Sequence, residues 1–136
     1  MSDVTRNVCD LLVEYLEQLE VEYVFGVPGA HISALFEALA VSEKRGGPRA
    51  ILTRHETGAA NMADGYARET GKLGVVCATT GPGSTNLITG VASALADNVP
   101  LLVITAQTPL PKFGKGALQD SSCAAIDTVG MFRHCT

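Results

Sequence analysis

Three short stretches of the chain combine polar side chains with glycine or alanine, a composition typical of loops that hold small ligands. They are residues 27–31 (Val-Pro-Gly-Ala-His), residues 54–56 (Arg-His-Glu) and residues 79–86 (Thr-Thr-Gly-Pro-Gly-Ser-Thr-Asn). Glu56 is the strongest candidate for chemistry, because a carboxylate held beside small residues can exchange a proton with a bound ligand. A second interpretation is that Glu56 is an ordinary first-turn acid that complements a helix dipole. Spacing alone favours neither interpretation.

Each of these stretches follows a short apolar run that is typical of a buried strand. The runs are residues 23–27, 49–52 and 73–78, and a fourth covers residues 100–106. Apolar residues at three- and four-residue steps predict four helices: residues 3–20, a second from Ile32 to before the turn at 45–48, a third that Gly71 stops, and a fourth through Ala96.

Strands and helices that alternate with short connections predict a single doubly wound α/β domain. Its sheet should be mostly parallel, with helices on both faces. Ligands bind such sheets at the carboxyl ends of the strands, so the three polar stretches are expected to converge on one edge.

The third predicted helix carries a face of small residues. Ala59, Ala60, Ala63 and Ala67 recur at helical spacing. A face without bulky side chains allows close approach, so we expect a partner subunit to pack against it.

The last part of the chain departs from this alternation. Residues 108–122 contain two prolines and two glycines among scattered polar residues, which predicts an irregular segment. Residues 123–131 then predict one short helix. A long irregular segment in a compact domain is usually functional or contacts a partner.

Composition bounds the class of protein. The 136 residues are 46% hydrophobic, which suffices for the core of one domain, and the formal net charge of −4 gives no electrostatic reason to expect nucleic acid or an anionic membrane as a partner. No secretory signal pattern opens the chain. The four cysteines (Cys9, Cys77, Cys123 and Cys135) have no C-x-x-C spacing, so free thiols in a cytoplasmic protein are expected rather than disulfides or metal ligands.

Several common site motifs are incomplete or missing. Gly81, Gly83 and Asn86 form only half of a dinucleotide fingerprint, because the final glycine is replaced. No Gly-Lys-Ser/Thr of a P-loop follows, and Ala59 stands where a zinc-protease motif starting at His55 would need its second histidine. The spacing supports no Ser-His-Asp triad and no metal site.

In combination, three motifs resemble the N-terminal pyrimidine-binding domain of thiamine diphosphate enzymes. The motifs are residues 24–29 (Val-Phe-Gly-Val-Pro-Gly), residues 54–68 (Arg-His-Glu-Thr-Gly-Ala-Ala-Asn-Met-Ala-Asp-Gly-Tyr-Ala-Arg) and residues 80–87 (Thr-Gly-Pro-Gly-Ser-Thr-Asn-Leu). The resemblance runs in order from about residue 5 to residue 136 and is strongest to the acetolactate (acetohydroxyacid) synthase branch.

The resemblance implies a role for each motif. The family's glutamate that matches Glu56 hydrogen-bonds N1′ of the cofactor's aminopyrimidine and thereby promotes loss of the proton at C2 of the thiazolium. A 2-oxo acid is then decarboxylated, and the carbanion is transferred to an acceptor. The cofactor-binding residues implied by the resemblance are Pro28, Gly29, Ala30, Glu56, Gly83, Ser84 and Asn86.

Two further residues match positions near the family's active site. Gln119 matches a glutamine in an active-site loop of the synthase branch, and His31 follows the loop near the thiazolium. For His31 and His55 the alternative is a structural hydrogen bond at the start of a helix.

Departures from the family pattern bear on the function. Ala30 stands where benzoylformate decarboxylase has serine, the adjacent histidine pair of pyruvate decarboxylase does not occur, and the presence of Glu56 argues against glyoxylate carboligase. Residues 1–136 match the N-terminal domain only, and no Gly-Asp-Gly metal motif occurs. The family's middle domain and its C-terminal domain, which binds magnesium and the diphosphate, are absent from this chain, so the 136 residues alone are expected to be inactive.

The resemblance implies a homodimer or higher homo-oligomer that acts on a small 2-oxo acid, and it leaves open whether FAD is bound. Two alternatives stay open at this point. One is another thiamine diphosphate carboligase or decarboxylase, and the other is a non-catalytic interaction module that retains the fold.

Overall fold

A four-stranded parallel sheet forms the centre of the domain. The computed structural model describes residues 6–136. The strands are β1 (Tyr23–Gly26), β2 (Arg49–Leu52), β3 (Gly74–Ala78) and β4 (Leu101–Thr105). Their order across the sheet is β2-β1-β3-β4, and every neighbouring pair is parallel.

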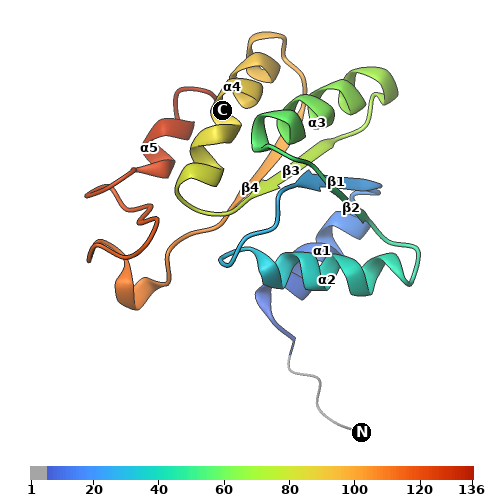
Figure 1. Ribbon diagram of the computed structural model, residues 1–136. Coiled ribbons are helices and arrows are strands. Elements are labelled where there is room, and N and C mark those ends of the chain that lie inside the picture. Colours follow the sequence, from blue (N-terminus) through green and yellow to red (C-terminus); the bar gives the residue numbers. More distant parts are fainter. Residues whose placement is uncertain (1–5) are drawn as a thin grey trace, which may run out of the picture.

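Helices cover both faces of the sheet. Helices α1 (Val8–Gln18) and α2 (Ser33–Glu43) lie below the sheet in Figure 1, and α3 (Glu56–Thr70) and α4 (Pro82–Ala96) lie above it. The short helix α5 (Thr128–Phe132) lies beside α4. The predicted doubly wound α/β fold is therefore confirmed.

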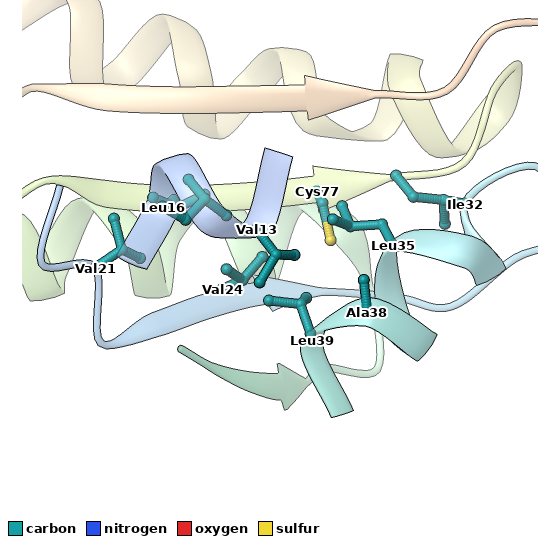
Figure 2. Packing of buried hydrophobic residues seen from close by; sticks show 10 residues of the cluster. Val13, Leu16, Val21, Val24, Ile32, Leu35, Ala38, Leu39 and Cys77 are labelled. Carbon is teal, nitrogen blue, oxygen red and sulfur yellow. The ribbon is translucent and has the colours of Figure 1, made fainter. Parts of the chain in front are cut away.

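Two hydrophobic clusters fill the spaces between the sheet and its helices, because alternate residues of a strand point to opposite faces. On one face, Val24 and Cys77 pack against residues of α1 and α2 such as Leu16 and Leu39 (Figure 2). Burial raises the pKa of the Cys77 thiol to about 12, so this thiol stays protonated at neutral pH. All four cysteines are free thiols, as expected. Cys77 and Cys135 are buried, and Cys123 is exposed.

Helix α3 begins and ends where its sequence predicts. His55 is the N-cap, and its Nδ1 accepts a hydrogen bond of 3.2 Å from the N–H of Thr57. This confirms the structural interpretation of His55. Gly71 ends the helix in the left-handed conformation, with φ of 70°.

The alanine face of α3 lies inside the domain. Ala59, Ala60 and Ala63 are fully buried in the second cluster, which also contains Leu87 of α4. The expectation that this face contacts a partner subunit is therefore wrong. Small residues are needed here because α3 lies very close to α4: a Cβ atom at Gly90 of α4 would be 2.5 Å from the Cβ of Ala60.

Both ends of the chain differ from the predicted helix bounds. Asn7 and Asp10 form a capping box that starts α1 at Val8; residues 3–5 of the predicted helix lie outside the described residues. The predicted helix over residues 123–131 is reduced to α5, because Asp127 takes a left-handed conformation (φ of 45°) and caps the helix by accepting from the N–H of Gly130. Residues 108–122 are irregular as predicted, except for a 3-10 turn at Leu110–Lys112.

None of the helices in residues 6–136 combines the length and apolar character that a bilayer-spanning helix requires.

The packing of α3 predicts the effect of enlarging its buried face. We expect Ala63→Leu to lower the free energy of unfolding by about 1–3 kcal/mol, because added methylenes in a filled core force neighbours apart. Urea denaturation measures the change. The matched control is Ala40→Leu, which makes the same change at an exposed position of α2. The control should change stability by less than about 0.5 kcal/mol, and a stable Ala63→Leu variant that loses only its oligomeric state would contradict the buried placement.

Candidate functional site at the carboxyl edge of the sheet

The three polar stretches meet at one edge of the sheet. β1, β2 and β3 are parallel, with Gly26 aligned to Leu52 and to Cys77, so the loops that follow them leave from the same edge. The connection through α2 runs over one face to β2, and the connection through α3 returns over the other face to β3 (Figure 1). The chain therefore changes direction between β1 and β3, which is where ligands bind in such folds.

Glu56 is fixed by a side chain of another helix. It is half-buried at the first position of α3, and its Oε2 accepts a hydrogen bond of 2.9 Å from the Nδ2 of Asn86 on α4. The Thr57 hydroxyl donates to the Asn86 carbonyl over 2.6 Å. These bonds hold the starts of α3 and α4 together. They also show that Glu56 does more than complement the dipole of its own helix.

The second carboxylate oxygen of Glu56 lies near a glycine. A Cβ atom at Gly83 would be 3.5 Å from Glu56 Oε1 and only 2.8 Å from the Cγ2 of Thr79. A Cβ atom at Gly29 would be 2.6 Å from the Cβ of Thr79. Gly29 and Gly83 thus enclose Thr79 from two loops, and a side chain at either position would collide with it.

Two buried polar atoms in this region have no hydrogen-bond partner among residues 6–136. They are the Oγ1 of Thr79 and the Nδ1 of His31. The structural hydrogen bond considered for His31 is thus not found at this nitrogen. Of the predicted loop residues that precede His31, Pro28 and Ala30 are exposed and Gly29 is half-buried.

Two predicted binding residues use their side chains inside the protein. Ser84 is fully buried, and its hydroxyl donates to the Thr79 carbonyl over 2.9 Å. The Asn86 amide is engaged by Glu56. Both residues shape the loop after β3, and direct contact of either with a ligand stays a prediction.

Gln119 lies against the loop after β3, although it is far away in the sequence. A Cβ atom at Gly81, whose φ is 67°, would be 2.6 Å from the Cβ of Gln119. The Gln119 carbonyl accepts hydrogen bonds from the hydroxyls of Thr80 (3.0 Å) and Thr108 (3.2 Å). The irregular segment therefore borders the candidate site.

Asp120 organises this irregular segment, and sequence reasoning missed it. Its carboxylate accepts hydrogen bonds from the backbone N–H groups of Ser122 (3.0 Å), Gly116 (3.3 Å) and Gly114 (3.4 Å). The bond from Ser122 makes the largest contribution to lowering the pKa of Asp120, and the two glycine N–H groups add to it. A lone aspartate after two glycines was the only signal in the sequence.

An open hollow of about 800 Å³ lies at the opposite edge of the sheet, around the amino ends of β1 and β2. The three cations that line it are each paired with a neighbouring acid: Lys72 with Glu22, Arg49 with Glu43 and Arg45 with Glu17. These charged side chains are therefore accounted for by ion pairs at the surface and do not indicate a ligand site. Within residues 6–136 no group of three or more His, Cys, Asp or Glu side chains is arranged to hold a metal ion.

Comparison with known proteins gives one family. Residues 6–129 match the family described as "Thiamine pyrophosphate enzyme, N-terminal TPP binding domain". The acetolactate synthase large subunit of Lactococcus lactis is 46% identical over 121 residues, covering 89% of this chain and 20% of that protein. Acetolactate synthase isozyme 2 large subunit of Escherichia coli is 45% identical over 130 residues (96% and 22%).

A plant relative gives a similar result. The chloroplastic acetolactate synthase of Arabidopsis thaliana is 45% identical over 124 residues, covering 91% of this chain and 18% of that protein. The chain thus spans about a fifth of the length of these relatives.

The carboxylate of Asp120 predicts a pH-dependent contribution to stability. Because folding lowers its pKa from the ordinary 3.8, the stabilisation is complete above that value and is lost as the pH falls through the lower folded value. Asp120→Asn should destabilise the protein at neutral pH, since an amide NH₂ would then face a backbone donor. Urea denaturation of both proteins between about pH 7 and pH 3 should show the difference shrinking below about pH 4.

The exposed Glu37 of α2 provides the control. Glu37→Gln should leave stability nearly unchanged across the same range. A difference between wild type and Asp120→Asn that grows as the pH falls would contradict the assigned role of this carboxylate.

Proposed function

Because the chain belongs to the thiamine pyrophosphate enzyme family, as the N-terminal TPP binding domain of an acetolactate synthase-type enzyme, we propose that it activates thiamine diphosphate for decarboxylation of a 2-oxo acid. The carbanion that decarboxylation leaves is transferred to an acceptor. The bound cofactor supplies the electron sink for this chemistry, and the protein supplies orientation and electrostatics.

The residues at the carboxyl edge fit an aminopyrimidine ring. Gly29 and Gly83 both lie against the Thr79 side chain, and the half-buried Glu56 lies next to Gly83. The hydroxyl of Thr79 adds a polar atom without a partner within residues 6–136. An aromatic heterocycle with ring nitrogens matches a carboxylate and a hydroxyl that lie beside small residues.

The proposal rests mainly on the different surroundings of the two oxygens of the Glu56 carboxylate. Oε2 is held by the Asn86 amide at 2.9 Å. Oε1 lies on the side of Gly83, 3.5 Å from where a Cβ atom of that residue would be. One oxygen therefore fixes the orientation of the group, and the other remains to hold or share a proton with N1′ of the ring.

The other residues of the site position the Glu56 carboxylate and the loops around it. Asn86 orients the Glu56 carboxylate, and Ser84 holds the loop after β3 through the Thr79 carbonyl. Gly29 and Gly83 make room for the Thr79 side chain between the two loops, while Pro28 and Ala30 lie on the exposed side of the loop after β1. We place the diphosphate and its magnesium ion in the part of the relatives' chains that this sequence does not cover.

The proposal includes a homodimer or higher homo-oligomer. It is supported by the outer side of α3, where the exposed Met62 lies between two glycines. A Cβ atom at Gly58 or Gly65 would meet no atom of residues 6–136 within 4 Å, so this part of the helix is open to a close neighbour.

We expect Glu56→Gln to slow proton exchange at C2 of the bound cofactor by at least ~10²-fold, because an amide can hydrogen-bond N1′ but cannot share the proton. The measurement is hydrogen–deuterium exchange at C2, made on the natural polypeptide that carries this domain, after loading with thiamine diphosphate and Mg²⁺.

The control is Glu69→Gln, which changes an exposed carboxylate near the other end of α3. This variant should exchange at the wild-type rate. A Glu56→Gln protein that binds the cofactor and exchanges as fast as wild type would refute the role of Glu56.

A further inference from the structure

The Thr79 side chain lies at the centre of the candidate site, but its hydroxyl makes no hydrogen bond with residues 6–136. The other three hydroxyls between residues 79 and 85 all donate to backbone carbonyls: Thr80 to Gln119, Ser84 to Thr79 and Thr85 to Pro82. The loop thus satisfies each neighbouring hydroxyl and leaves this one unbonded.

An unbonded buried hydroxyl is costly. Folding removes it from water, and nothing in the protein replaces the lost hydrogen bonds. Native proteins keep few such groups, and each calls for an explanation such as a bound ligand or water. Valine has nearly the same shape as threonine and would avoid the cost, so packing alone does not account for a threonine at position 79.

The surroundings of Thr79 indicate what its hydroxyl faces. Its Cγ2 lies towards Gly83, on the side of the Glu56 carboxylate, because a Cβ atom at Gly83 would be 2.8 Å from it. A Cβ atom at Gly29 would be 2.9 Å from both the Oγ1 and the Cγ2 of Thr79, so the hydroxyl borders the loop after β1. His31, two residues beyond Gly29, supplies the second unbonded buried atom of this edge. Two of the four unbonded buried side-chain atoms within residues 6–136 therefore come from the segments that follow β1 and β3, and the other two belong to Ser122 and Thr128.

We propose that Thr79 is a further ligand-contacting residue, whose hydroxyl hydrogen-bonds an acceptor nitrogen or oxygen of the ligand that lies between the loops after β1 and β3. The inference rests on the proposed function. The acceptor is either a ring nitrogen of thiamine diphosphate or an oxygen of the 2-oxo acid. The methyl group of Thr79 packs near Gly83 and directs the hydroxyl away from Glu56, so the two residues contact different atoms.

Three variants of the natural polypeptide test the proposal. Thr79→Val removes the hydroxyl and keeps the shape, and Thr79→Ser keeps the hydroxyl. Thr128→Val is the matched control, because Thr128 of α5 has an equally buried and unbonded hydroxyl but follows the irregular segment rather than a strand of the site. Titration calorimetry measures the Kd of thiamine diphosphate with Mg²⁺ present, and steady-state kinetics with pyruvate gives KM.

If the hydroxyl contacts the cofactor, Thr79→Val should raise its Kd by roughly three- to tenfold, the loss of one hydrogen bond. If it contacts the substrate, the cofactor Kd stays constant and KM rises by a similar factor. Either result supports the proposal, provided that Thr79→Ser and Thr128→Val stay close to wild type in both quantities.

Other outcomes overturn it. Unchanged Kd and KM in Thr79→Val would show that the hydroxyl touches no ligand. An equal loss in Thr79→Ser would assign the effect to the methyl group, and an equal loss in Thr128→Val would assign it to the fold as a whole. Failure of Thr79→Val to fold would also contradict the proposal, because loss of an unbonded hydroxyl does not destabilise. A wild-type protein that binds no thiamine diphosphate would instead refute the proposed function.

Discussion

The hydrogen bond between the Asn86 amide and the Glu56 carboxylate connects the polar stretch after β2 with the polar stretch after β3 at the candidate site. It spans 30 positions of sequence and joins the first turns of α3 and α4 at 2.9 Å. Because it uses one carboxylate oxygen, it sets the direction of the other. The bond from the Thr57 hydroxyl to the Asn86 backbone fixes the same two helix ends. A carboxylate on a flexible turn would lack this fixed direction and would lose the advantage of a preorganised group.

Small residues make that bond possible. α3 and α4 approach closely because Ala60 faces Gly90, where even one added methyl carbon would collide. A glycine likewise allows α3 to pack closely against β3, since a Cβ atom at Gly74 would be 2.4 Å from the Ala63 carbonyl oxygen. The buried alanines therefore serve the site indirectly. They set the separation of two helices whose amino ends carry the carboxylate and its partner.

The edge of the sheet collects groups that the domain itself does not satisfy. Thr79 and His31 each keep a buried polar atom without a partner in the described part of the chain. The segment after β4 is ordered by its own hydrogen bonds: Asp120 accepts three backbone N–H groups, and the Gln119 carbonyl accepts two hydroxyls. The buried hydroxyls of Ser122 and Thr128 in this part of the chain likewise have no partner within residues 6–136.

The sequence by itself determined the alternation of strands and helices, the parallel sheet and the edge at which the polar stretches meet, because hydrophobic period and turn residues are local properties. It also indicated Glu56 as the candidate for chemistry, through its place after a strand and its family motif. Only the tertiary structure decided which face of α3 is buried, since alanine suits both a core and an interface. It likewise decided that Asn86 holds Glu56, that the Thr79 hydroxyl has no partner within residues 6–136 and that Asp120 orders its segment. Those properties are hydrogen bonds between chain positions whose distance in space no local pattern encodes.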